Sequence, residues 1–273
     1  MAGDEAAVPL EATAALVMAW AAPLYRDGPA GAFVSRLDLS GGDPLRSACE
    51  AVCPWYGEVI CNRKAFIRGQ VEGWIAGARD PCRVVVAAAG MSPLGIELAG
   101  THPPDRLAGV VEFDRAGMEE KERLVAGCLA GGIECRTADV AGIGDLLPPG
   151  PVVLVLEGIS YYLSSGEIRR VMEACRSPDR TNRVIIEYLA PCRMVAPERR
   201  AIPRGVFGRI RSACGMDAIG TWSPGEMDAI ITGAGGEIEG RFSLCDMERS
   251  RTGTARRFPV PEAGWIWCTT ARL

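Results

Sequence analysis

Short runs of apolar residues alternate with amphipathic stretches through the middle of the chain. The pattern predicts parallel strands over 83–89, 107–113, 133–138, 152–156 and 184–189, and helices over 93–100, 115–131 and 164–176. Strands that alternate with helices favour right-handed crossovers and a parallel sheet covered on both faces. The sequence therefore predicts an α/β fold: a Rossmann-like, doubly wound sheet, mostly parallel.

The segments outside residues 81–190 follow other patterns. Residues 1–80 predict a helical N-terminal cap, with helices over 13–25, 30–39 and 62–78. Residues 191–224 are rich in Arg and Pro and have poor periodicity, so they predict a lid insertion above the sheet. Residues 225–273 predict a closing helix and two strands, 237–245 and 265–271, which pair as an antiparallel hairpin with no helix between them. One domain over 1–273 is the economical interpretation.

Composition and charge exclude several classes of protein. The chain has 273 residues and a net charge of −4, with no long basic run, which argues against nucleic acid or an anionic membrane as a partner. Every long apolar stretch is interrupted well short of the ~20 residues that a membrane span needs. The acidic N-terminus lacks the basic region of a signal peptide, so we expect a cytoplasmic protein.

The cysteines and the single histidine offer little chemistry. There are 11 cysteines but no CxxC pair, which favours reduced, apolar core residues over a metal site. His102 follows the first sheet helix, at the end of the sheet opposite the ligand-binding end, so we expect a surface residue and not a general base.

The carboxyl ends of the predicted strands carry small residues and carboxylates. Ala88 and Gly90 follow the first strand, where a ligand can approach the backbone, and the next three strands end at four acidic side chains: Glu112, Asp114, Asp139 and Glu157. Such an edge suits a ligand with ribose hydroxyls, an adenine amine and a positive centre. It does not suit pyrophosphate, because neither a P-loop nor a clean GxGxxG is present.

The order of these motifs resembles a known family. NRKAFI, AAAGMSP, VVEFDR, CRTADV and VLEGISYYL occur in the order of the leucine carboxyl methyltransferase family, which belongs to the Rossmann-like, class I S-adenosylmethionine-dependent methyltransferases. The resemblance covers about residues 60–190, and VLEGISYYL is its most specific motif. It implies an O-methyltransferase that uses S-adenosylmethionine, releases S-adenosylhomocysteine, and methylates a carboxylate or hydroxyl of a small molecule or a protein C-terminus.

The resemblance also assigns roles to residues, and two positions depart from its pattern. It implies that Arg63 pairs with the methionine carboxylate, Gly90 allows close approach, Asp114 holds the ribose, Asp139 and Val140 face the adenine, Glu157 faces the methionine amine, and Tyr162 lines the methyl-transfer pocket. Family members usually have Gly at Ala88 and Asp at Ser92. Ala88 suits its position if its backbone angles are ordinary.

Two other functions remain open at the level of sequence. One is an NAD-dependent oxidoreductase on a similar sheet, although Pro93 and Leu94 occupy the region of the third glycine and no proton relay is evident. The other is a non-catalytic S-adenosylmethionine-binding protein, in which Ala88 and Ser92 mark decay. Methyl transfer itself requires mainly positioning and desolvation, so a site without histidine or metal suits an acidic oxygen as acceptor.

Overall fold

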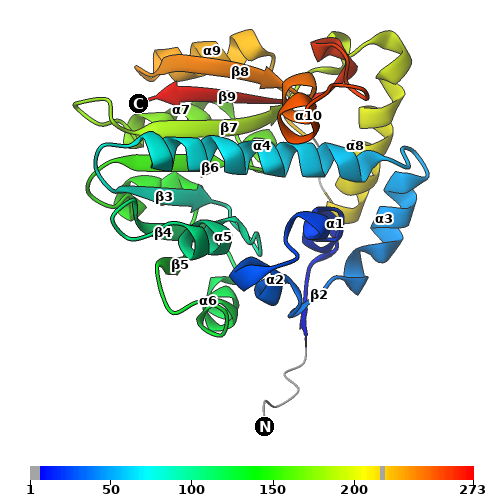
Figure 1. The fold of residues 1–273 in the computed structure, drawn as a ribbon. Coiled ribbons are helices and arrows are strands. Elements are labelled where there is room, and N and C mark those ends of the chain that lie inside the picture. The colour runs from blue at the N-terminus through cyan, green and yellow to red at the C-terminus, as the bar shows by residue number, and fades with distance from the viewer. Residues whose placement is uncertain (1–6, 216–218) are drawn as a thin grey trace.

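The computed structural model describes residues 7–215 and 219–273, and its centre is one mixed β-sheet. In that part of the chain the sheet has seven strands in the order β5-β4-β3-β6-β7-β9-β8, and only β9 runs antiparallel to its neighbours (Figure 1). The strands are β3 (Cys82–Ala87), β4 (Leu107–Asp114), β5 (Ile133–Thr137), β6 (Val152–Leu156), β7 (Arg183–Leu189), β8 (Glu237–Ser243) and β9 (Ile266–Arg272). The predicted doubly wound α/β sheet is confirmed.

The central strands are apolar on both sides because helices cover both faces. Along β3, Val84 and Val86 belong to one buried cluster, while Val85 and Ala87 belong to the other. This alternation is the period-two geometry of a strand, and burial on both faces explains why residues 84–87 are all apolar. Every residue of β6 is likewise buried.

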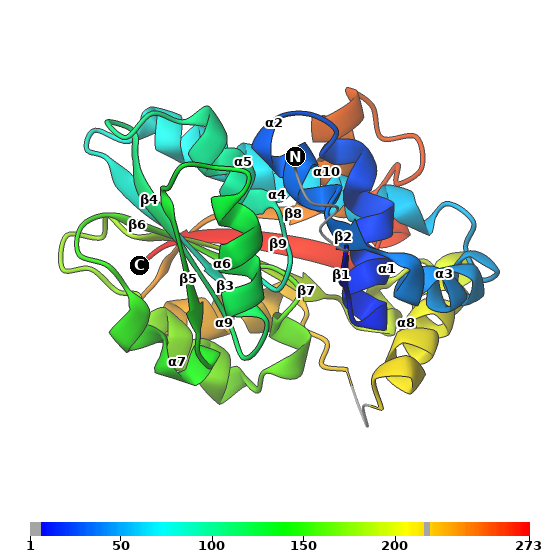
Figure 2. The same ribbon diagram turned by 90° about the horizontal axis from the view of Figure 1, so that it is seen from below.

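The helices divide between the two faces (Figures 1 and 2). The first face packs against α4 (Tyr56–Gly77), α5 (Leu94–Thr101), α6 (Met118–Ala126) and α10 (Leu244–Thr252). The second face packs against α7 (Ser165–Ala174) and α9 (Pro224–Gly233), each of which begins at a serine capping box. The predicted helix over 115–131 is shorter than expected, because the chain leaves the helix at Gly127.

The N-terminal segment forms a cap beyond the carboxyl ends of the strands. It consists of α1 (Ala12–Ala21), α2 (Gly28–Val34), α3 (Asp43–Glu50) and a short parallel pair, β1 (Val8–Pro9) with β2 (Leu37–Asp38). The sequence did not predict α3 or this pair, and the helix expected over 30–39 ends at Val34. The helix expected over 13–25 ends at Ala21, and Gly28 and Pro29 begin α2, because Pro is favoured in a first helical turn.

In the C-terminal part, the structure corrects the expected connection between the last two strands and shows a helix in the predicted lid segment. The two predicted strands pair antiparallel as β8 and β9, but helix α10 lies between them, so the expectation of no intervening helix is wrong. In the sheet, β9 inserts between β7 and β8. The capping box Ser243–Asp246 starts α10, and the helix packs on α4. In the predicted lid segment, α8 (Ala201–Cys214) contacts α1 and α3, while positions 216–218 lie outside the described residues.

Candidate functional site

A cavity of about 440 Å³ opens at the carboxyl ends of β3, β4 and β6. Helices α1 and α8, which lie beyond these strand ends (Figure 1), supply part of its wall. This is the end of the sheet at which open α/β folds bind ligands. Its volume lies within the range of about 300–1,000 Å³ usual for small-molecule sites. Seven of the nine residues predicted as site residues line it: Arg63, Ala88, Gly90, Asp114, Val140, Glu157 and Tyr162.

The turn after β3 forms the floor of the cavity in a left-handed conformation. Gly90 has φ +46°, and its N–H donates a hydrogen bond of 2.9 Å to Oδ2 of Asp114 at the end of β4. Ala88 has φ +52°, so the condition of ordinary backbone angles, under which Ala would suit this position, is not met. A residue with a Cβ is strained in this region, which is the physical reason for a glycine at such a position.

Replacing Ala88 by glycine is expected to raise the free energy of unfolding by about 1 kcal/mol, because the left-handed backbone no longer carries a Cβ. Urea denaturation of the two proteins measures the difference. The control is Ala89→Gly: Ala89 is buried and has no positive φ, so glycine there should lower stability by about 1 kcal/mol. A loss of stability in Ala88→Gly would contradict the assignment of strain.

The edge of the cavity at β4 and β5 contains Asp114, Arg115 and Val140, but not Asp139. The Asp139 carboxylate accepts a hydrogen bond from the Ala141 N–H at 2.8 Å and pairs with Nε of Arg115 at 2.6 Å. These two contacts, the Ala141 N–H first, hold the pKa of Asp139 below its usual value. Asp139 thus caps the helical turn that presents Val140 to the cavity, and it lies just outside the wall.

A buried cluster of charged side chains closes the inner end of the cavity. Glu157 Oε1 lies 2.9 Å from Arg63 and 3.0 Å from Lys64, both on α4. Glu187 on β7 accepts the Gly158 N–H at 2.8 Å and lies 3.9 Å from Arg63. All four side chains are at most 9% exposed. The sequence did not identify Lys64 or Glu187, although Lys64 directly follows Arg63 in NRKAFI.

The two carboxylates of this cluster differ in proton affinity. Burial acts to raise the pKa of Glu157, but Lys64 and Arg63 outweigh it and hold the pKa below its usual value. Burial raises the pKa of Glu187, and Arg63 opposes that effect only in part. The cluster therefore holds one firmly ionised carboxylate between two cations, and a second carboxyl group that keeps its proton more readily.

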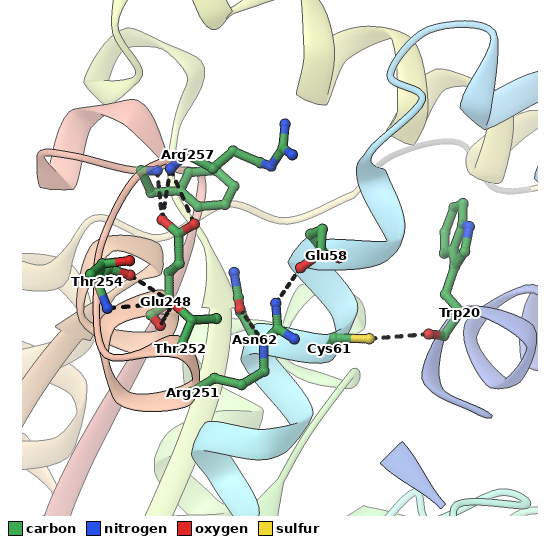
Figure 3. Close-up of polar contacts among 10 residues, drawn as sticks. Trp20, Glu58, Cys61, Asn62, Glu248, Arg251, Thr252, Thr254 and Arg257 are labelled. Atoms are coloured by element: carbon green, nitrogen blue, oxygen red, sulfur yellow. Dashed lines mark hydrogen bonds and ion pairs between the residues drawn. The ribbon is translucent and has the colours of Figure 1, made fainter. Parts of the chain in front are cut away.

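Contacts with α1 and α10 hold the turn of α4 directly before Arg63 and Lys64, and Figure 3 shows those made by Glu58, Cys61 and Asn62. Arg251 of α10 donates to Oδ1 of Asn62 at 2.6 Å and also pairs with Glu58, while the Cys61 thiol donates to the Trp20 carbonyl of α1 at 3.2 Å. Glu248 accepts the N–H groups of Arg257 and Phe258, which anchors the loop after α10 (Figure 3). Helix α4 is thus held by α1 and α10 at the turn directly before the two cations.

Glu112, also predicted to bind the ligand, does not line the cavity. Its carboxylate pairs with Nζ of Lys121 at 2.7 Å, and both side chains are fully buried between β4, α5 and α6. Helix α5 approaches so closely that a Cβ on Gly95 would lie 2.5 Å from Oε1 of Glu112. Lys121 Nζ also donates to the Ser92 carbonyl at 2.8 Å. The pair therefore braces the turn after β3 from behind and does not contact the cavity.

Two tyrosines lie beside the cavity after β6. Tyr162 lines it with a half-exposed side chain, and its ring meets that of Tyr161 edge-on at 5.0 Å between centroids. Burial, followed by the charge of Glu187, raises the pKa of the Tyr161 hydroxyl well above its usual value. Gly158 has φ +75°, and a Cβ there would lie 3.5 Å from that hydroxyl. His102 follows α5 and is not among the lining residues.

Residues 7–215 and 219–273 contain no group of three or more His, Cys, Asp or Glu side chains arranged to hold a metal ion. Over the same ranges, no helix combines the length and the apolar character needed to cross a bilayer.

Comparison with known proteins extends the description of the fold. No family model matches the sequence, and no curated protein matches it. Among solved structures, the chain is similar to a putative methyltransferase from Thermobifida fusca, with 16% identity, a TM-score of 0.60, and 89% of this chain and 92% of the other covered. The chain has the Rossmann-like fold of class I methyltransferases. A DUF574 family protein from Streptomyces avermitilis is also similar, with 17% identity, a TM-score of 0.61, and 85% and 90% covered.

Proposed function

We propose that this protein is an S-adenosylmethionine-dependent O-methyltransferase acting on a small molecule. The observation that carries the proposal is that one cavity contains the left-handed turn at Gly90, the Asp114 carboxylate at the edge of β4, and the ion cluster around Glu157. S-adenosylmethionine requires a group of each kind. The turn lets the nucleoside approach the backbone, the carboxylate accepts hydrogen bonds from the ribose hydroxyls, and the ion cluster receives the methionine zwitterion. The fold shared with a putative methyltransferase supports the same proposal.

The residues of the cavity fit the cofactor from end to end. Asp114 accepts hydrogen bonds from the ribose, Ala138 and Val140 bound the adenine, and Gly90 allows the nucleoside to approach. At the inner end, Glu157 receives the methionine amine and Arg63 the methionine carboxylate. The zwitterion carries one positive and one negative group. When it binds, each of these groups replaces one partner of the Arg63–Glu157 ion pair, so no buried charge is left unpaired. Lys64 remains beside Glu157 and keeps it ionised.

The chemistry required of the protein is positioning. When bound, the cofactor supplies an electrophilic methyl group on a sulfonium sulfur. Helices α1 and α8 supply one wall of the cavity, and Tyr162 lines the space in which the acceptor oxygen is held. Asp139 acts indirectly, since it caps the turn that bears Val140.

The turn after β3 disfavours the oxidoreductase alternative. The Gly90 N–H is occupied by Asp114, and the Ser92 N–H donates to the Ala89 carbonyl at 2.9 Å. A pyrophosphate needs such amides free at the start of the following helix. The turn therefore suits an uncharged nucleoside linkage better than a dinucleotide.

Isothermal titration with S-adenosylmethionine, S-adenosylhomocysteine and NADH tests the proposal. We expect the two S-adenosyl compounds to bind with Kd values of about 1–100 µM and NADH to bind much more weakly. If neither S-adenosyl compound bound, or if NADH bound more tightly, the proposed function would be abandoned.

Asp114→Asn is expected to weaken S-adenosylhomocysteine binding about 10- to 100-fold, because a neutral amide replaces the charged acceptor of the ribose hydroxyls. The matched control is Asp105→Asn, a change of the same kind at an exposed position that does not line the cavity. Titration of both variants measures the difference. Equal affinities would exclude Asp114 as the ribose ligand.

A further inference from the structure

The part of the cavity beyond the proposed cofactor site is an apolar chamber. Its walls come from three helices: Val17 and Met18 of α1, Tyr56 and Ile60 of α4, and Phe207 and Ile210 of α8. Helices α1 and α8 contact each other and lie together beyond the strand ends in both views (Figures 1 and 2). Accepting the proposed function, this chamber is where the methyl acceptor binds.

Among the described lining residues, the charged groups come from α4 and from the carboxyl ends of β4 and β6, and none comes from α1 or α8. They are Arg63, Lys64, Asp114, Arg115 and Glu157. Arg63 and Lys64 pair with Glu157, and the largely exposed Arg115 pairs with Asp139. Helices α1 and α8 therefore present no ionised side chain to the chamber, and a second charge on the acceptor would be buried without a partner.

The arginines of the lid segment do not change this balance. The described arginines over 191–211 do not line the cavity. Arg199 lies over the rings of Trp55 and Phe258, at 5.9 and 5.7 Å from their centroids. Arg200 donates to the carbonyl groups of Val195 and Arg193. Arg199 and Arg200 thus hold the lid in place, and the described arginines over 191–211 supply no cation to the cavity wall.

The inner end of the cavity favours one negative charge on the reacting oxygen. Arg63 and Lys64 lie 2.9 and 3.0 Å from Glu157 and hold its pKa below the usual value, while burial raises the pKa of Glu187. A bound sulfonium adds a further positive charge. The described cavity wall has no histidine, and burial raises the pKa of the Tyr161 hydroxyl well above its usual value. An acceptor that arrives deprotonated needs no general base.

We propose that the methyl acceptor is a small, largely apolar acid whose ionised oxygen is its single charged group. A carboxylic acid and an acidic phenol or enol share this chemistry. The acceptor oxygen forms a bond to the methyl carbon as the carbon–sulfur bond breaks, and the bond's electron pair stays on sulfur. Anion and sulfonium are both neutralised, so the products are an apolar methyl ester or ether and a thioether, and no proton is released.

Binding of four probes tests the proposal in the presence of saturating S-adenosylhomocysteine. Isothermal titration compares decanoate and an acidic nitrophenol with glutarate and with a short peptide that ends in leucine. We expect at least one of the two apolar acids to bind at least about tenfold more tightly than glutarate and the peptide. Equal affinities, tighter binding of glutarate or the peptide, or no binding of either apolar acid would overturn it. Failure of S-adenosylhomocysteine itself to bind would instead count against the proposed function.

A charge introduced into the chamber gives an independent test. Ile210→Asp is expected to weaken binding of the apolar acid at least about tenfold while S-adenosylhomocysteine affinity stays within about twofold. Ser212→Asp adds the same charge to an exposed position of α8 outside the cavity and should change neither affinity. Phe207→Ala, a milder change in the same wall, should also weaken the apolar acid. If both chamber variants bound it like the wild type, the chamber would not be the acceptor site.

The methylated product shows whether the acidic oxygen belongs to a carboxylic acid or to an acidic phenol or enol. With S-adenosylmethionine labelled in its methyl group, a methylated apolar acid passes into organic solvent. Alkali releases labelled methanol from an ester and leaves an ether intact, so the label identifies carboxylate or phenol. Label retained in water on the peptide would contradict the proposal.

Discussion

Replacing Gly90 by valine is expected to reduce affinity for S-adenosylhomocysteine by about 100-fold, or about 2.7 kcal/mol. Gly90 has φ +46°, and the nearest atom to an added Cβ is Oδ2 of Asp114 at 3.8 Å, so the protein itself does not block the Cβ. Because Gly90 lines the cavity, we expect the larger side chain to take up space there, where the nucleoside is proposed to approach the backbone. Isothermal titration measures the loss.

Gly28→Val separates this blocking effect from backbone strain. Gly28 begins α2 with φ +65° and has no atom within 4 Å of an added Cβ, so valine there carries a similar backbone cost, about 1–2 kcal/mol, far from the cavity. We expect this variant to lose stability in urea but to bind S-adenosylhomocysteine like the wild type. Undiminished binding by Gly90→Val would show that the nucleoside does not pass over this turn.

Replacing Lys121 by methionine is expected to lower the free energy of unfolding by about 3–5 kcal/mol, because it leaves the fully buried Glu112 carboxylate without its cation. Removing the charge from both positions, in Glu112→Leu with Lys121→Met, should recover most of that loss, since two apolar side chains need no partner. Urea denaturation of the single and double variants measures both effects.

The control for this prediction lies on the same helix. Arg123 of α6 pairs with Glu120 at 2.6 Å, but both side chains are more than a third exposed. Arg123→Met should therefore cost only about 0–1 kcal/mol. If Lys121→Met were as mild as Arg123→Met, the buried pair would not be a main support of the turn after β3.

The sequence predicted the central sheet because its signals are local. β6 and the apolar part of β3 are uninterrupted apolar runs, and such runs indicate burial on both faces without any knowledge of the partners. The cap was harder to predict, since α3 and α8 depend on packing against α1. Helix α10 did carry a local signal, the Ser243–Asp246 capping box, but its few apolar residues hid it.

A site residue could be predicted only where its sequence pattern is compatible with a single environment in the fold. Asp114 and Glu112 lie on the same face of β4, two residues apart, so their pattern is identical. Only the position of α5 and α6 makes Asp114 half-buried at the cavity and Glu112 fully buried against Lys121.

The sequence did not reveal Lys64, because its environment also depends on how a helix packs. Adjacent helical residues point about 100° apart, and only the packing of α4 brings both Arg63 and Lys64 to Glu157.

Helix α4 contributes to both ends of the cavity, but most of the remaining wall of each end comes from a separate stretch of chain. Residues 82–158 supply the strands and turns at one end, and α1 with α8, far apart in sequence, supply much of the other. Mutant libraries confined to the inward positions of these two helices therefore offer a route to new acceptors. Selection for altered specificity can proceed there while the nucleoside-holding scaffold is kept constant.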